Sequence, residues 1–192
     1  MSSEKDIQHW VALCQNGDQD AFGHLYDQFV DSIYRYVYFR VRQTEAEDLT
    51  EAVFVKAWEN ITQYKQGQFR FSSWLFRIAH NVVVDHYRTS RPVEELVEEY
   101  KDERTDRHPI SQTEVKLTHS MLRGSIAELK QVYQHVLVLK FFDDFSNTEV
   151  AEILGKSEGS LRILQFRALR ALKKVLQNRG IDAFEADFHR NK

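Results

Sequence analysis

The stretch SNTEVAEILGKSEGSLRILQFRALRALKK, residues 146–174, has the pattern of two helices separated by a very short break. Ser146, with Glu149 three residues later, forms a capping box, a typical helix start. Gly155 can adopt the left-handed conformation that ends this helix, and Ser157 can then cap a second one. Two helices joined so closely are typical of a helix-turn-helix, in which the second helix enters the major groove of DNA.

The second helix has an apolar face and a basic face. The apolar positions that can pack inward are Leu161, Leu164, Ala168, Ala171, Leu172 and Val175. Side chains that can point outward are those of Arg162, Gln165 and Arg170, with Arg167 at the edge. Arginine and glutamine can distinguish guanine and adenine edges, and Lys173 and Lys174 suit phosphates. A basic helix of this kind can also be a solvated surface or lie on a membrane. The capped helix before it favours DNA.

The composition is that of a globular chain of 192 residues with 42% hydrophobic content. The two prolines, Pro92 and Pro109, both fall in the middle, so the flanking stretches can run as helices. Cys14 is the only cysteine, which fits a reducing compartment. No run of about 18 apolar residues is present, and MSSEKDIQHW lacks the order of a secretory signal. We expect a cytoplasmic protein without membrane insertion.

Charge is strongly segregated along the chain. Residues 64–91 hold five basic residues and one acidic residue, a net charge of +4, whereas residues 94–106 have a net charge of −5. The overall charge of −3 therefore hides basic blocks separated by an acidic one. Residues 92–117 are expected to be a flexible acidic linker. The linker could cover the basic surfaces and suppress DNA binding, but a solvated linker is the simpler interpretation.

Apolar spacing of three and four residues predicts helices over most of the remaining chain. It is found in residues 7–14, 22–41, 49–61 and 75–86. Residues 132–142, VYQHVLVLKFF, could pass for a strand in isolation, but their helical neighbours favour a helix. We expect an all-α protein of two small helical domains joined by the linker, with the helix-turn-helix in the C-terminal domain. The predicted boundaries are 1–91, 92–117, 118–179 and a tail, 180–192.

Four segments together resemble the extracytoplasmic-function class of bacterial RNA polymerase sigma factors. In chain order they are GDQDAFGHLYDQF, AEDLTEAVFVKAWEN, FRFSSWLFRIAHNVVVDHYR and FSNTEVAEILGKSEGSLRILQFRALRAL. The first three resemble parts of sigma region two, and the fourth resembles region four. The resemblance implies a promoter-specificity subunit with core RNA polymerase and promoter DNA as partners, and an anti-sigma protein as a possible inhibitor.

The resemblance also implies three sets of site residues. The set that would dock on the clamp coiled coil of the polymerase's largest subunit is Asp48, Leu49, Glu51, Phe54, Val55 and Trp58. The set that would bind and open the minus-ten element is Phe69, Arg70, Phe71, Trp74, Arg77, Asn81 and Arg88. The set that would read the minus-thirty-five element is Ser157, Glu158, Ser160, Arg162, Gln165, Arg167 and Arg170. Many relatives have Ser and Arg where this chain has Ile163 and Leu164.

The minus-ten set also has a physical rationale of its own. Capture of single-stranded DNA requires aromatic surfaces for unstacked bases and cations for the backbone. Residues 69–88 supply both kinds of side chain. The alternative is that aromatics such as Trp74 and Phe76 belong to the core.

No pattern of residues indicates an enzyme, a cofactor or a metal centre. His80 and His86 are six residues apart, so they do not share a helical face at metal-ligand spacing. Adjacent acids, Asp143 and Asp144, are typical of a solvated turn. Two alternatives to a sigma factor remain: a helix-turn-helix regulator that binds DNA without polymerase, and a helical protein whose basic helix contacts an acidic partner. The regulator would need a ligand pocket or a dimer interface in residues 1–91.

Overall fold

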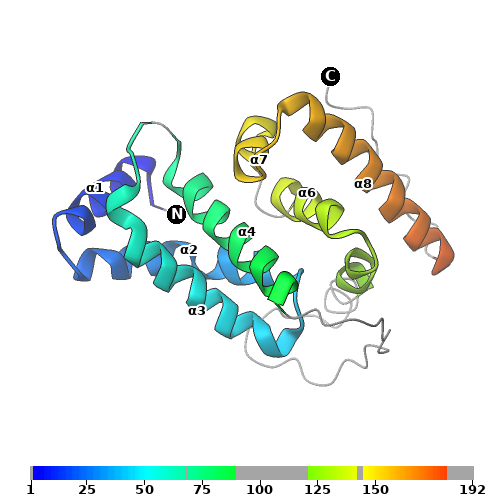
Figure 1. Cartoon of the computed structure of the whole chain (residues 1–192), viewed down its shortest axis with the longest axis horizontal. Helices are drawn as coiled ribbons and strands as arrows, with labels where there is room; N and C mark the ends of the chain where they lie inside the picture. Colours follow the sequence, from blue (N-terminus) through cyan, green and yellow to red (C-terminus); the bar gives the residue numbers. More distant parts are fainter. Residues whose placement is uncertain (1, 68, 90–120, 142–144, 181–192) are drawn as a thin grey trace.

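The computed structural model describes residues 2–67, 69–89, 121–141 and 145–180 (Figure 1). All regular elements within these ranges are helices, which confirms the all-α prediction. Three predicted features lie outside the described residues: the acidic linker, the Asp143-Asp144 pair and the C-terminal tail. The hypothesis that the linker is autoinhibitory concerns the first of them.

The first half of the chain is a bundle of four helices and one short 3₁₀ turn. Its elements are α1 (Glu4–Gln15), α2 (Asp20–Tyr38), α3 (Gln43–Asn60), η1 (Ile61–Gln63) and α4 (Phe71–Thr89). Ser3 and Asp6 cap the start of α1 reciprocally. Gly17 turns the chain between α1 and α2 with φ of +94°, a conformation that side chains with a Cβ rarely adopt.

The apolar stripes predicted from sequence converge on one core in this half. α2 lies at its centre and contacts α1, α3 and α4, while α3 also packs on α4. Each of these helices contributes side chains that are at most 1% exposed, including Val11, Leu25, Ile33, Val53 and Leu75. Burial of aliphatic groups of this size is the main favourable contribution to folding.

α3 begins earlier than the sequence pattern indicated. The apolar spacing was found from residue 49 onward, but the helix starts at Gln43. The main-chain N–H of Arg42 donates to the Glu45 carboxylate over 3.3 Å, and Ala46 is fully buried. Glu45 therefore lies in the first turn of α3, and Glu47, Asp48 and Glu51 lie in the turns that follow.

The second half comprises a helical segment at 121–127 followed by α6 (Gln131–Phe141), α7 (Asn147–Ile153) and α8 (Glu158–Asn178). α6 is a helix, as predicted, and six consecutive residues, Gln134–Leu139, are buried. A helix enclosed on all sides has no polar face, which explains the strand-like composition of this stretch. α6 packs on both α7 and α8.

The helix-turn-helix is present as predicted. Ser146 and Glu149 form the capping box at the start of α7, and Gly155 follows that helix with φ of +61°. The Ser157 hydroxyl accepts from the main-chain N–H of Ser160 over 3.3 Å and caps α8. Only Leu154–Ser157 separate the two helices.

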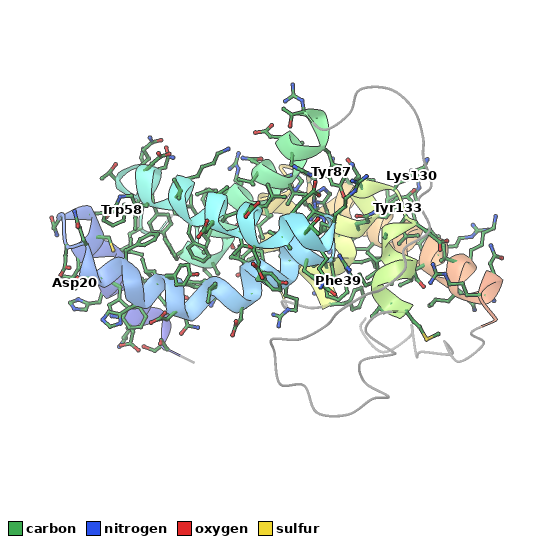
Figure 2. All side chains as sticks on the ribbon, turned by 90° about the horizontal axis from the view of Figure 1, so that it is seen from below. Asp20, Phe39, Trp58, Tyr87, Lys130 and Tyr133 are labelled. Atoms are coloured by element: carbon green, nitrogen blue, oxygen red, sulfur yellow. The ribbon has the colours of Figure 1, made fainter. Side chains whose placement is uncertain are left out.

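The two halves pack against each other along a boundary that we call the seam. α4 lies beside α7, and the end of α2 reaches α6 (Figure 1). Phe76 of α4 meets Phe145 with ring centroids 4.8 Å apart. Figure 2 shows the side chains of the two halves meeting near the labelled Tyr87 and Tyr133.

Candidate nucleic-acid and polymerase interfaces

The side of α8 that points away from α6 and α7 is the first candidate surface. Gly159, Ile163, Phe166 and Arg170 follow one another at spacings of four, three and four residues, so they lie along one line of the helix. All four are exposed, and Arg162 and Arg167 flank the line. We call the six residues together the α8 outer face.

The cations of this face are free of carboxylates within the part of the chain that is described. Arg162, Arg167 and Arg170 are exposed and form no ion pair with any described acidic residue. Lys173 and Lys174 extend the same basic strip toward the end of the helix. Their charges are therefore available to a polyanion.

The other predicted minus-thirty-five residues are engaged in local hydrogen bonds. Ser157 caps α8 and donates to the Ser160 hydroxyl over 2.9 Å. The Glu158 carboxylate accepts from Thr148 over 2.8 Å. Gln165 is half-buried, and its amide donates to Asn147 of α7 over 2.9 Å. Gln165 was predicted to point outward, and in the structure it lies half-buried against α7, which supplies this partner.

α4 and the residue pair before it form the second candidate surface. Of the predicted minus-ten set, six side chains are exposed or half-buried: Phe69, Arg70, Trp74, Arg77, Asn81 and Arg88. Phe71 is only 1% exposed and packs against Phe29 and Tyr64. In this conformation the Phe71 ring is part of the core, and its predicted DNA contact stays a prediction. Trp74 also contacts the core but keeps part of its surface.

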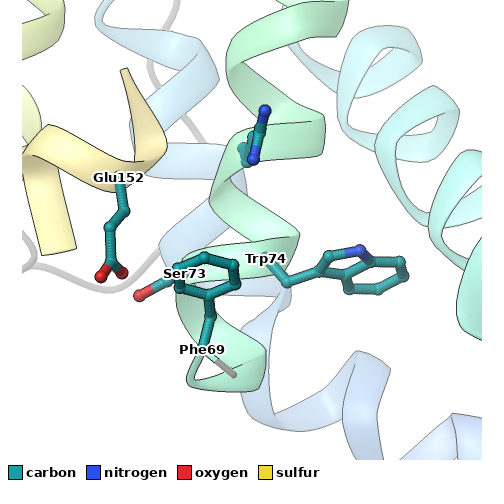
Figure 3. A pocket seen from close by; sticks show the side chains of 5 residues that line it. Phe69, Ser73, Trp74 and Glu152 are labelled. Carbon is teal, nitrogen blue, oxygen red and sulfur yellow. The ribbon is translucent and has the colours of Figure 1, made fainter. Parts of the chain in front are cut away.

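A shallow pocket opens where the start of α4 meets α7 (Figure 3). Its lining residues are Phe69, Ser73, Trp74, Arg77 and Glu152. In Figure 3, Phe69 and Ser73 lie on the side facing Glu152, and the Trp74 ring extends the other way. The Ser73 hydroxyl is buried and has no hydrogen-bond partner within the described ranges. Burial, together with the nearby Glu149, raises the pKa of Glu152.

Arg70 joins this surface to two other elements. Its guanidinium lies 3.1 Å from Glu4 of α1 and 3.2 Å from Glu149 of α7. The Glu149 pKa is lowered by hydrogen bonds from Ser146 and by Arg70, against the opposing effect of its burial. In this conformation α7 therefore covers part of the surface predicted to bind the minus-ten element.

α3 presents the third candidate surface. Asp48, Glu51, Val55 and Trp58 are exposed along one side of the helix, with Val55 at 55% and Trp58 at 37%, and Leu49 is half-buried. Phe54 is only 5% exposed and lies in the core beneath this surface, so its predicted contact with polymerase stays a prediction.

Two aromatic residues of α2 pack against this α3 surface. Phe22 meets the Trp58 ring with centroids 5.0 Å apart, and Tyr26 packs on Phe54 at 4.7 Å. Tyr26 is itself 39% exposed beside the α3 residues. Tyr26 could not be predicted from the sequence as part of this surface, because it lies on α2 and only the packing brings it to α3.

The described residues contain neither a metal-binding group nor a membrane-spanning helix. Within them, no three His, Cys, Asp or Glu side chains form a group that could hold a metal ion. His80 instead faces His135 of α6, with their Nδ1 atoms 2.9 Å apart. None of the helices in the described ranges combines the length and apolarity needed to cross a membrane.

Comparison with known proteins matches residues 25–93 to Sigma-70 region 2 and residues 119–172 to Sigma-70, region 4. The ECF RNA polymerase sigma factor BldN of Streptomyces coelicolor is 37% identical over 169 residues. That alignment covers 86% of this chain and 64% of BldN, so the chain spans less than two thirds of that relative. SigW of Bacillus subtilis, also an ECF RNA polymerase sigma factor, is 31% identical over 186 residues, covering 91% of this chain and 99% of SigW.

Two solved structures share the fold. CnrH in complex with the cytosolic domain of CnrY gives a TM-score of 0.69 at 23% identity, covering 92% of this chain and 99% of that one. The sigma factor RpoE in complex with the anti-sigma factor NepR from Bartonella quintana gives 0.65 at 17% identity, covering 81% and 96%. The family assignment rests on sequence: the chain aligns with 99% of SigW at 31% identity, and it matches sigma regions 2 and 4 in order. The chain belongs to the ECF RNA polymerase sigma factors.

Proposed function

We propose that this chain binds core RNA polymerase and directs transcription from specific promoters. The observation that supports this most is that three exposed surfaces, on α3, α4 and α8, fall within the two matched sigma regions, two of them in region 2 and one in region 4. Residues 1–91 and 118–179 would form the two functional domains. The chain would act in the cytoplasm as an initiation factor, and catalysis would belong to the polymerase.

The α3 surface is the proposed polymerase contact. It combines the acidic Asp48 and Glu51 with the exposed apolar Val55 and Trp58. Exposed aromatic and apolar side chains beside charges are typical of protein interfaces. Leu49 and Tyr26 extend this surface, while Phe54 supports it from the core.

The two basic surfaces are the proposed DNA contacts. Phe69 and Trp74 supply rings for unstacked bases, and Arg70, Arg77 and Arg88 supply cations for the minus-ten strand. The α8 outer face would read duplex DNA at the minus-thirty-five element. Arg70 would have to exchange its carboxylate partners for phosphates, so DNA binding at α4 would require separation of α7 from α4.

An anti-sigma protein is the proposed inhibitor. The solved structure of RpoE, which shares this fold, holds the anti-sigma factor NepR. Control by a partner of that kind would fit a chain whose predicted minus-ten surface is partly covered by its own second half.

The test is transcription of a fragmented source genome by bacterial core polymerase with and without this chain, followed by sequencing of RNA 5′ ends. New start sites with shared, spaced upstream motifs are expected only when the chain is present. Trp58→Ala should reduce assembly with core, and Asp31→Ala, at an exposed position of α2, is the matched control. Sequence-specific protection of duplex DNA by the free chain, with no new start sites, would favour the independent regulator instead.

A further inference from the structure

The α8 outer face carries two large apolar side chains that the fold does not use. Ile163 is 56% exposed and Phe166 is 67% exposed, the highest value among the large hydrophobic residues described. The opposite side of α8 already supplies the core with Leu161, Ala168, Leu172 and Leu176. Ile163 and Phe166 are therefore not needed for packing within the described part of the chain.

The position of these residues on α8 places them toward base edges. α8 begins at Glu158, so Ile163 lies in its second turn and Phe166 in its third. In a helix-turn-helix the N-terminal part of the second helix contacts bases. Gly159, one turn before Ile163, has open space where a Cβ would stand. The absence of a side chain there lets the helix approach a ligand closely.

The surroundings of the two apolar residues are cationic. Arg162 and Arg167 are the sequence neighbours of Ile163 and Phe166, and Arg170 lies one turn beyond Phe166. A face of this kind fits a polyanion that also offers an apolar group. Duplex DNA satisfies both conditions, because its phosphates flank a major groove in which the thymine C5-methyl is the apolar group displayed.

We propose that Ile163 selects thymine in the DNA bound by α8, by packing on the C5-methyl, and that Phe166 provides the adjoining apolar contact. The proposal rests on the proposed function, since it specifies which chemical group the same surface reads. It assigns base discrimination to an aliphatic side chain, beyond the hydrogen bonds of the arginines. The base read at this position is then set by shape and a methyl group, with no hydrogen-bond partner involved.

The test uses holoenzyme assembled from core polymerase and the full chain, on a promoter found by the 5′-end experiment. Each thymine of the upstream element is replaced singly by deoxyuridine, which removes the methyl and keeps every hydrogen-bonding group. Competition binding should show an affinity loss of about three- to fivefold at one or two positions, the value expected for one buried methyl group. In Ile163→Ala, replacing the thymine that Ile163 contacts by deoxyuridine should no longer reduce the affinity. The effect of deoxyuridine at the other thymines should be unchanged.

Phe141→Ala is the matched control, because Phe141 is also 56% exposed but lies on α6. It should leave the thymine-to-deoxyuridine ratio unchanged. Far-UV circular dichroism shows whether α8 remains folded in Ile163→Ala. Ile163→Val, which retains part of the apolar surface, should keep part of the discrimination.

Two results would overturn the proposal while leaving the proposed function intact. The first is specific promoter binding with equal affinity for thymine and deoxyuridine at every position. The second is an Ile163→Ala variant that loses affinity equally for DNA with thymine and for DNA with deoxyuridine. That result would assign Ile163 to a contact with the DNA backbone or with protein. Absence of any promoter-specific transcription would instead refute the proposed function, and this inference with it.

Discussion

The core of the first half and the seam between the halves differ in the polarity of the side chains that they bury. In the core, Leu25, Ile33 and Leu75 interlock with at most 1% of their surface exposed. At the seam, the side chain of Arg40 is buried to a similar degree, at 3% exposed, beside His135 of α6. The core of the first half is therefore packed by aliphatic groups, whereas the seam contains a buried guanidinium.

The seam places His135 at the centre of a polar cluster. Arg40 Nη2 lies 2.7 Å from His135 Nε2, and the guanidinium stacks on the Tyr36 ring at 4.5 Å. Tyr36 Oη and His80 Nδ1 lie 3.1 and 2.9 Å from His135 Nδ1. Because the guanidinium can only donate, the neutral imidazole must accept at Nε2 and carry its proton on Nδ1.

The cluster leaves a charge incompletely compensated. Among the described residues, Nε and Nη1 of Arg40 are buried without hydrogen-bond partners, and no carboxylate pairs with the side chain. Burial lowers the Arg40 pKa, although Tyr36 opposes the shift. Desolvating a charge in this way costs free energy that apolar packing does not. From this comparison we expect the seam to be less stable than the core of the first half and the two halves to separate before that core unfolds.

The largest expected effect comes from breaking the core. Ile33 is fully buried, so Ile33→Ala should lower the free energy of unfolding by about 2–5 kcal/mol through lost burial and a residual cavity. Denaturation by urea, followed by far-UV circular dichroism, measures the change. Asp31→Ala, at an exposed position of the same helix, should change stability by less than about 0.5 kcal/mol. A cost below that value for Ile33→Ala would mean that the core is loosely packed.

A smaller effect is expected from removing the acceptor at the seam. His135→Leu leaves the Arg40 guanidinium buried without its imidazole acceptor. The free energy of unfolding should fall by about 1–3 kcal/mol. The radius of gyration from small-angle scattering should increase as the halves part. The double variant Arg40→Met/His135→Leu should recover most of the loss, because an apolar pair needs no compensation. If the double variant is as unstable as the single one, the guanidinium is not the cause.

Acidification should weaken the seam further. Burial and the charges of Arg40, Lys156 and Arg77 lower the His80 pKa to about 4, and burial with Arg40 and His80 lowers that of His135 well below 6.5. The unfolded chain, with ordinary histidines, takes up more protons as the pH falls below about 6.5. Stability should therefore fall between about pH 6.5 and pH 4, by about 1 kcal/mol per histidine from pH 6.5 to 5.5.

Denaturation curves at several pH values measure this slope. In the double variant Arg40→Met/His135→Leu the slope between pH 6.5 and 5.5 should be shallower, since one of the two histidines is gone. An equal slope in both proteins would assign the pH dependence to groups outside the seam.

The smallest effect is expected at the exposed edge of the seam. Arg70 is 60% exposed where it meets Glu149, so loss of this ion pair in Glu149→Gln should cost less than about 1 kcal/mol. Glutamine retains the capping interaction with Ser146, which isolates the charge. Glu4→Gln removes the other partner of Arg70 and is the matched comparison. A loss above about 2 kcal/mol at Glu149 would show that charge pairing holds the halves together.

Much of the fold could be predicted from local patterns. Three-four spacing located α2 and α4, and the capping residues Ser146 and Ser157 located the starts of α7 and α8. These signals succeed because capping and amphipathicity act within a few residues of the chain. The same patterns could not place Phe54 and Phe71, because spacing shows that a helix has a buried face but does not fix how deeply a residue at its edge is covered.

The seam could not be predicted from the sequence. Tyr36 and His135 are separated by 99 positions, and no spacing rule links them. The spacing of His80 and His86 argued against a metal site, but it could not show that His80 lies beside His135. In the sequence, His135 is only a polar interruption in an apolar run. Contacts of this range depend on how the two halves dock, which local periodicity does not determine.

α7 touches both proposed DNA surfaces at once. On one side it holds Arg70 through Glu149, and on the other it holds α8 through the bonds from Thr148 to Glu158 and from Gln165 to Asn147. A helix shared in this way would couple the two proposed binding equilibria if its position differs between the bound states. Suppose that release of α7 from α4 changes the affinity of α8 for duplex DNA by some factor. By thermodynamic linkage, binding of duplex DNA to α8 must then change the equilibrium constant for release of α7 from α4 by the same factor. The two promoter elements would then be sensed jointly, through seven residues that need not touch the minus-ten DNA themselves.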